Sequence, residues 1–197
     1  EHNQEKTTLV NSVFDRVYKK YDLMNDIMSF GIHRLWKKNL VSWMNPQLGN
    51  KIIDVASGTG DLAKIISLKN NNQNHVCCAE PNQGMLLMGK KKLESLKNLT
   101  WHLCSAEKLP FKDNTFDFYS ISYGIRNVTD INQCLREAFR ILKPGGRFFC
   151  LEFSKVENKI LDLLYQNYSK LIPLFGKIII GNSDPYEYLI SSIDKFY

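Results

Sequence analysis

The chain has 197 residues, of which 44% are hydrophobic and 23% charged, and its formal net charge is +6. This balance predicts one globular domain with a sizeable core and excludes a disordered chain. No apolar run reaches the ~20 residues that span a bilayer, and the basic charge lacks the arginine-rich block typical of nucleic-acid binding, so no nucleic-acid partner is expected.

The first 46 residues predict helices that precede a nucleotide-binding unit. Apolar side chains at helical spacing indicate one helix within residues 7–21. A second helix is expected from His33 to Met44, and Asn45-Pro46 ends it. These helices could cover a cofactor or form a wall of the substrate site. For His33 and Trp36 taken singly, we expect packing against the sheet.

The most informative stretch is 51–63, Lys-Ile-Ile-Asp-Val-Ala-Ser-Gly-Thr-Gly-Asp-Leu-Ala. The apolar run from Ile52 to Val55 predicts a short buried strand, and a helical pattern begins after Gly58 and Gly60. Glycines let the backbone turn tightly and approach a ligand closely, and a helix start offers unpaired N–H groups. This order of strand, glycine turn and helix is typical of nucleotide-binding α/β proteins.

Three acidic residues indicate which nucleotide cofactor binds. Asp54 lies in the strand, Asp61 directly follows the second glycine, and Glu80 ends the next apolar run. Two carboxylates beside the turn would repel the pyrophosphate of NAD, whereas S-adenosylmethionine presents an ammonium and a sulfonium. An acid at position 80 can accept hydrogen bonds from both ribose hydroxyls. We therefore predict S-adenosylmethionine; a turn without a ligand is the alternative.

The rest of the chain alternates helices with strands, which predicts a doubly wound, mostly parallel α/β sheet. One domain is expected, with a helical cap over 1–46 and a cofactor-binding core over 47–197. The expected elements are a helix over 82–96 capped by Asn82, strands over 99–103 and 116–122, a helix over 131–142 capped by Asp130, a turn at 143–146 and a strand over 147–153.

With these motifs the chain resembles the class I S-adenosylmethionine-dependent methyltransferases and, more narrowly, the ubiquinone/menaquinone-biosynthesis C-methyltransferase family. The resemblance runs from about residue 7 to residue 193. It rests on Tyr21-Asp-x-Met-Asn25 with Ser29, His33 and Trp36, on Asp54–Asp61, Ala106–Phe111 and Tyr123–Asp130, and on Arg140–Gly146 followed by Glu152-Phe-Ser154.

The resemblance implies a Rossmann-like fold with the cofactor at the carboxyl ends of the strands. Glu80 stands where the family usually has Asp, and the longer acid keeps both acceptor oxygens. Ser105 stands where Asn is common. The residues expected to bind S-adenosylmethionine are Asp54, Gly58, Thr59, Gly60, Asp61, Glu80, Ser105, Ala106 and Ser122.

The implied reaction is C-methylation of a polyprenyl benzoquinol ring in ubiquinone biosynthesis, without a metal. The ring carbon becomes nucleophilic when a neighbouring phenol, with an ordinary pKa near ~10, loses its proton. Arg126 is the candidate to stabilise that phenolate, and Asn127 and Tyr21 are candidates to orient the ring hydroxyls. A structural ion pair that fixes its loop is the alternative for Arg126.

Other functions stay open. A demethylmenaquinol methyltransferase would share the motifs, and a cofactor-binding scaffold of a quinone-synthesis complex would share the binding site. An amino-methyltransferase acting on nucleic acid would favour an Asp/Asn-Pro-Pro-aromatic motif where this chain has Ser122-Tyr-Gly-Ile. An NAD oxidoreductase is disfavoured by Asp54 and Asp61.

The insoluble prenyl tail of such a substrate implies a peripheral membrane protein, placed on the matrix side of the mitochondrial inner membrane in a eukaryote and otherwise on the cytoplasmic face of the inner membrane. The resemblance also implies a quinone-biosynthesis complex. The family continues through a further helix and a strand pair, so the C-terminal strand pair is expected to be missing here, and the open sheet edge would permit a homodimer. The five cysteines lack zinc-ligand spacing, and we expect reduced thiols. The basic residues expected to face a membrane are Arg16, Lys19, Lys20, Arg34, Lys37 and Lys38.

Overall fold

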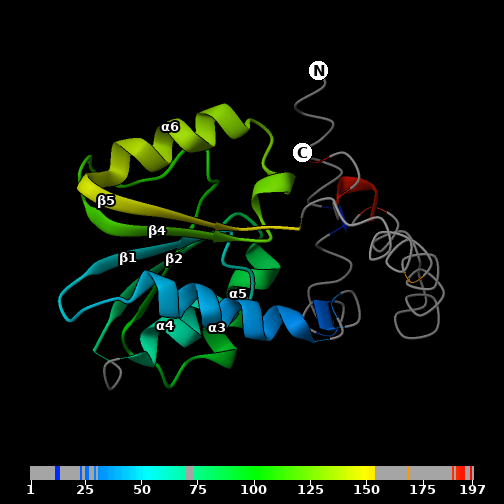
Figure 1. Ribbon diagram of the computed structural model, residues 1–197, viewed down its shortest axis with the longest axis horizontal. Coiled ribbons are helices and arrows are strands. Elements are labelled where there is room, and N and C mark those ends of the chain that lie inside the picture. The colour runs from blue at the N-terminus through cyan, green and yellow to red at the C-terminus, as the bar shows by residue number, and fades with distance from the viewer. Residues whose placement is uncertain are drawn as a thin grey trace.

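The computed structural model describes residues 12, 13, 23, 25, 26, 29, 31–69, 73–153, 168, 188, 190–193 and 196 (Figure 1). Apart from Ser12 and Val13, the helix predicted within 7–21 lies outside these residues. The named elements are α3 (Ile32–Met44), β1 (Lys51–Val55), α4 (Asp61–Ser67), β2 (His75–Glu80), α5 (Gln83–Lys92), β3 (Leu99–Leu103), β4 (Phe116–Ser122), the 3₁₀ helix η3 (Ile125–Asn127), α6 (Ile131–Ile141) and β5 (Leu142–Leu151).

The five strands form one parallel sheet in the order β3-β2-β1-β4-β5. After β1, the chain adds β2 and then β3 on one side of β1. It then crosses back, and β4 pairs with the other side of β1. The strand order therefore reverses between β1 and β4. In open α/β sheets, ligands bind outside the carboxyl ends of the strands at such a reversal. The predicted parallel α/β fold is confirmed.

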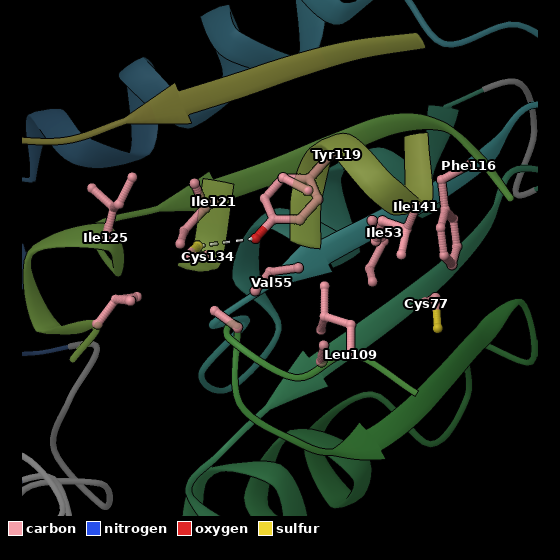
Figure 2. Packing of buried hydrophobic residues seen from close by; sticks show 14 residues of the cluster. Ile53, Val55, Cys77, Leu109, Phe116, Tyr119, Ile121, Ile125, Cys134 and Ile141 are labelled. Carbon is pink, nitrogen blue, oxygen red and sulfur yellow. Dashed lines mark hydrogen bonds between the residues drawn. The ribbon is translucent and has the colours of Figure 1, made fainter. Parts of the chain in front are cut away.

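Apolar side chains fill both faces of the sheet. Helix α6 covers one face, and α3, α4 and α5 cover the other (Figure 1). Cys77 and Cys78 alternate between the two cores, as neighbours on a strand must. On the α6 side the Tyr119 hydroxyl lies 3.6 Å from the Cys134 sulfur (Figure 2). All five cysteines are free thiols.

Two predicted helix caps are present. The side chains of Asn82 and Asp130 each accept a hydrogen bond from a backbone N–H three residues later, at 2.9 Å. Such caps satisfy donors that the first helical turn leaves unpaired. They explain why α5 and α6 begin where the sequence indicates. The helices end at Lys92 and Ile141, sooner than predicted.

The turn predicted at 143–146 lies inside β5 rather than before it. Phe116 pairs with Leu142 and Phe118 pairs with Arg147, so the register shifts between the two pairs. Gly145 has φ +77°, a conformation that favours glycine, and it lies where the ladder is interrupted. The strand continues to Leu151, two residues short of its predicted end.

Within the described part of the chain, no helix combines the length and the apolar character needed to cross a membrane. The same residues contain no group of three or more His, Cys, Asp or Glu side chains arranged to hold a metal ion.

Candidate functional site

Strained turns mark the carboxyl ends of the two central strands. Ala56 directly follows β1 with φ +52°, and Tyr123 directly follows β4 with φ +56°. Left-handed backbone conformations cost energy in residues other than glycine, and they gather at functional sites. The two turns also approach each other closely, because a Cβ built on Gly124 would lie 2.5 Å from the Ala56 Cβ. The carboxyl ends of β1 and β4 therefore lie close together at one edge of the sheet.

Glu80 ties the glycine turn to the loop after β2. Its Oε2 accepts a hydrogen bond from the Gly58 N–H at 2.7 Å, and its Oε1 accepts one from the Asn82 N–H at 2.9 Å. The whole residue is only 4% exposed. Burial raises the pKa of Glu80 to about 7, against the opposing effect of the two hydrogen bonds. The carboxylate lies where a ribose contact was predicted, and that contact stays a prediction.

Two further acids lie beside the turn in different electrostatic settings. Asp54 is buried on β1, where its Oδ1 accepts a hydrogen bond from the Ser120 hydroxyl at 2.9 Å. Burial raises the pKa of Asp54 to about 7, although Ser120, Lys37 and the Ala63 N–H oppose the rise.

Asp61 opens α4 between two lysines. Its Oδ1 is 2.8 Å from Lys92 Nζ, and its Oδ2 is 3.6 Å from Lys37 Nζ. Burial alone would raise the pKa of Asp61, but the two lysines outweigh it and the pKa is lowered. Asp61 is therefore ionised at neutral pH, whereas the carboxyl group of Asp54 titrates close to neutral pH.

The donor set at this edge fits S-adenosylmethionine. The hydroxyls of Ser57 and Ser122 and the Asp54 Oδ2 are buried and have no hydrogen-bond partner among the described residues. A buried polar atom without a partner costs about 1–3 kcal/mol, so a polar ligand that satisfied these atoms would be stabilised here. Carboxylates at Asp54 and Glu80 suit a ligand that carries an ammonium and a sulfonium.

The other predicted cofactor residues reach the same edge. Thr59 is buried within the turn. Gly60 has φ +84°, and a Cβ there would lie 2.8 Å from both Trp101 and Leu93, so only glycine fits. Ser105 and the buried Ala106 follow β3, next to the point where the Cys104 N–H donates to the Glu80 carbonyl oxygen at 3.3 Å.

Arg126 lies in η3, just after β4, and is buried against Glu152. Its Nε is 2.8 Å from Glu152 Oε1, and its Nη1 donates to the Ser192 hydroxyl at 3.2 Å. The guanidinium carbon lies 5.3 Å from the centre of the Phe153 ring. The pKa of Glu152 is raised by burial, although Arg126 opposes the rise. The ion pair that was the alternative for Arg126 is thus present, and its action on a substrate stays a prediction.

Of the two residues predicted to orient the ring hydroxyls, Asn127 is described by the structure and Tyr21 is not. Asn127 follows Arg126 in η3, and its Oδ1 accepts a hydrogen bond from the Tyr188 hydroxyl at 3.1 Å. Tyr21 lies outside the described residues.

Sequence reasoning placed the helix that became α3 near the cofactor or the substrate, but it missed the burial of Lys37 there and wrongly expected Lys37 to face a membrane. This helix runs opposite to the strands, and its first turns lie at their carboxyl ends (Figure 1). His33 is buried there, with its Nε2 2.9 Å from Asp26 Oδ1 and its ring edge-on to Tyr123. Lys37, one turn later, is also buried. The available signal was the spacing of His33 and Lys37, which are four residues apart and therefore lie on the same helix face. Lys37 had instead been grouped with the basic residues expected to face a membrane.

Comparisons with known proteins identify the family and the fold of this chain. The model of the ubiE/COQ5 methyltransferase family matches residues 2–197. A Rickettsia bellii protein named ubiquinone/menaquinone biosynthesis C-methyltransferase UbiE is 51% identical over 98% of this chain and 80% of its own length. A Brucella suis protein of the same name is 49% identical over 98% of this chain and 74% of its own. An Aquifex aeolicus SAM-dependent methyltransferase structure shares the fold, with a TM-score of 0.61 and 19% identity over 77% of this chain and 85% of its own.

Proposed function

Because the chain belongs to the ubiE/COQ5 methyltransferase family, we propose that this S-adenosylmethionine-dependent C-methyltransferase acts on a polyprenyl benzoquinol in ubiquinone biosynthesis. The observation that carries the proposal is the buried Arg126, which follows the carboxyl end of β4 beside the predicted cofactor site. The chain is also half identical to a protein named as a ubiquinone/menaquinone biosynthesis C-methyltransferase. A cation at that position suits a substrate whose reactive form is a phenolate.

Arg126 would favour the reactive form of the ring. Bound S-adenosylmethionine supplies a methyl group that its sulfonium makes electrophilic. A fixed guanidinium beside a phenol lowers the phenol pKa, since it stabilises the anion in a water-poor site. Arginine keeps its own proton, so the phenol proton passes to water. The ring carbon would then take the methyl group as the bond between that group and the sulfur breaks, which leaves neutral S-adenosylhomocysteine. Transfer of the ring-carbon proton to water would restore the aromatic ring.

Other residues would hold the ring and keep water out. The Tyr123 and Phe153 rings stack with centres 4.7 Å apart, and Trp36 meets Phe153 edge-on at 6.1 Å. These aromatic rings lie beside Arg126 and could form one apolar wall for the quinol. Asn127 offers an amide to a ring hydroxyl. Positioning of the ring carbon against the methyl group would be the main contribution of the protein.

An assay with two ring types tests the substrate. The purified protein is given S-adenosylmethionine and either a prenylated methoxybenzoquinol or a demethylmenaquinol, under conditions that keep both reduced. We expect faster methylation of the benzoquinol. Preference for the naphthoquinol would assign the chain to menaquinone biosynthesis, and binding of S-adenosylhomocysteine without transfer to either ring would support a non-catalytic scaffold.

The outward face of α3 supports a further proposal, that the protein docks on an anionic membrane. Trp43 is 76% exposed and Leu35 57% exposed, and Ile32 and Trp36 extend the apolar stripe along the helix. Arg34 and Lys38 are exposed on the same helix. Amphipathic helices with basic flanks bind interfaces, with about 1 kcal/mol from each basic side chain near anionic lipid. The mitochondrial or bacterial inner membrane, a quinone-biosynthesis complex and a homodimer stay predictions from the family.

Vesicle sedimentation tests the membrane proposal. Binding should require anionic lipid and weaken with added salt. Trp43→Ser and Lys38→Glu should each reduce it, whereas Lys64→Glu, which removes a lysine from α4, should not. Equal sedimentation with neutral and anionic vesicles, or equal loss in all three variants, would contradict docking through α3.

A further inference from the structure

We propose that Lys37 anchors the α-carboxylate of S-adenosylmethionine, which makes α3 part of the cofactor site. The inference rests on the cofactor assigned above. It gives a binding role to a residue that the sequence pattern placed among surface lysines.

Lys37 points its ammonium toward the edge where β1 and β4 end. The side chain is buried, and the whole residue is 7% exposed. Its Nζ lies 3.6 Å from Asp61 Oδ2, at the start of the helix behind the glycine turn. The same Nζ lies 5.8 Å from the centre of the Tyr123 ring, in the turn after β4. Lys37 thus lies between the start of α4 and the turn after β4. The buried hydroxyls of Ser57, in the turn after β1, and Ser122, at the end of β4, have no hydrogen-bond partner among the described residues.

The charges around Lys37 leave a place for an anion. Asp61 is closer to Lys92, at 2.8 Å, than to Lys37, at 3.6 Å. Two ammonium groups therefore share one carboxylate, and the trio carries a net charge of +1. Asp54 also acts on this region, but burial raises its pKa to about 7, so near neutral pH it compensates only in part. His33, the titratable group on the preceding turn of α3, is disfavoured as a cation, because burial and Lys37 lower its pKa.

The amino-acid end of the cofactor matches this arrangement of charges. It carries a carboxylate and an ammonium on one carbon atom. A carboxylate beside Lys37 would give its ammonium a second anionic partner besides Asp61, which lies 3.6 Å away, and Asp54 offers a carboxylate to the ammonium of the cofactor. A buried ammonium needs such pairing, since an uncompensated buried charge is strongly destabilising.

A purely structural role for Lys37 would have a different signature. If Lys37 only held Asp61 and α4 in place, its loss would weaken every ligand of the adenosine site alike. An anchor for the carboxylate affects only ligands that carry one. The two roles therefore separate when ligands with and without the carboxylate are compared.

Titration calorimetry with two ligands makes this comparison. S-adenosylhomocysteine carries the carboxylate, and its decarboxylated analogue keeps the ammonium and the adenosine but lacks it. In Lys37→Met the affinity for S-adenosylhomocysteine should fall about tenfold or more, as expected for a lost charge-assisted hydrogen bond. The affinity for the decarboxylated analogue should change less than about twofold. Lys64→Met, which removes an exposed lysine of α4, should change neither.

Different outcomes of this titration contradict the role of Lys37 and the cofactor assignment. Equal losses for both ligands in Lys37→Met, or an unchanged affinity for S-adenosylhomocysteine, would overturn the role of Lys37. If Lys37→Met does not fold, the wild-type protein decides, because it must prefer S-adenosylhomocysteine over the decarboxylated analogue by about tenfold; equal binding overturns the proposal. Failure of the wild-type protein to bind either ligand would instead contradict the cofactor assignment.

Discussion

At the level of single residues, buried carboxyl groups dominate the candidate site. Asp54 and Glu80 lie behind the glycine turn, and burial raises the pKa of each to about 7. Glu152 is also buried, opposite Arg126. Desolvation favours the neutral form of an acid, whereas a cationic ligand favours the charged form. The site therefore holds carboxyl groups whose charge depends on what lies beside them.

Asp54 should make folding stability depend on pH. Its folded pKa is raised from 3.8 to about 7, so the folded state holds a proton that the unfolded state has released across that interval. The stabilisation is complete below the unfolded pKa and is lost as pH rises through the folded pKa. Chemical unfolding of Asp54→Asn and the wild-type protein should show the variant gaining relative stability from pH 5 to pH 8. A constant difference would contradict the raised pKa. The Asp54 charge also helps to raise the pKa of Glu80, so the measured difference includes this coupling.

Replacement of Glu80 should affect both the cofactor and the loops. Glu80→Ala leaves the buried N–H groups of Gly58 and Asn82 without their acceptor, at a cost of about 1–3 kcal/mol each. Calorimetry should show weaker binding of S-adenosylhomocysteine to this variant. Glu80→Asp, which keeps two acceptor oxygens, should recover most of the affinity. Unchanged affinity in a folded Glu80→Ala would argue against a ribose contact.

Variants of Arg126 and Glu152 can separate a catalytic role of the Arg126 charge from a structural role of the ion pair. Arg126→Gln should lower kcat about 100-fold, as for loss of one donor that stabilises a developing anion, and leave the affinity for S-adenosylhomocysteine unchanged. Glu152→Gln breaks the same ion pair but keeps the cation, so it should lower kcat far less. Loss of one partner of a buried pair costs about 3–5 kcal/mol, so kinetics are measured where both variants are folded. Equal falls in kcat would assign Arg126 a structural role.

At the level of elements, close packing of β3 against two glycines positions the turn. Trp101 on β3 lies beside Gly60 of the turn and Gly89 of α5. A side chain on either glycine would enter the space of the indole ring. The tryptophan thus joins α5 to the start of α4, and this contact holds the glycine turn from the side opposite α3.

Gly89→Ala should therefore destabilise the protein in spite of the higher helix propensity of alanine. Its Cβ would lie 2.8 Å from Trp101 Cζ3 and 3.1 Å from the Thr59 carbonyl oxygen. Overpacking of this kind costs about 1–3 kcal/mol. Denaturant unfolding should show this loss, and Trp101→Phe in the same chain should recover part of it, since contacting residues are not additive. A neutral or stabilising Gly89→Ala would show that α5 moves away freely.

Elements defined by local signals were predictable from sequence, and those defined by distant contacts were not. The caps at Asn82 and Asp130 and the strand–turn–helix at 51–63 depend on neighbours in sequence. The interruption within β5 depends on its register with β4, which no local pattern encodes. The four-residue spacing of His33 and Lys37 indicates one shared helix face, but the partner that Lys37 meets there depends on how α3 crosses the sheet, so the contact with Asp61 could not be predicted.

At the level of the whole molecule, the parallel order β3-β2-β1-β4-β5 gathers the candidate site from distant segments. Residues from α3, the turns after β1 and β4, and the loop after β2 meet at one edge of the sheet (Figure 1). A cofactor bound there contacts elements that are far apart in sequence and therefore stabilises the fold as a unit. For a ligand that binds only the folded state, the gain is about 2.7 kcal/mol at a concentration of 100 Kd.

Transfer of a labelled methyl group tests most directly whether this edge carries out C-methylation. The purified protein is incubated with S-adenosylmethionine labelled with ¹³C in its methyl group and with a reduced prenylated methoxybenzoquinol, and the product is examined by NMR. We expect the label in a methyl group bonded to a ring carbon, and about one hundredth as much product from Arg126→Gln in the same time. A label on a ring oxygen, or no transfer by a wild-type protein that binds S-adenosylhomocysteine, would contradict the assignment.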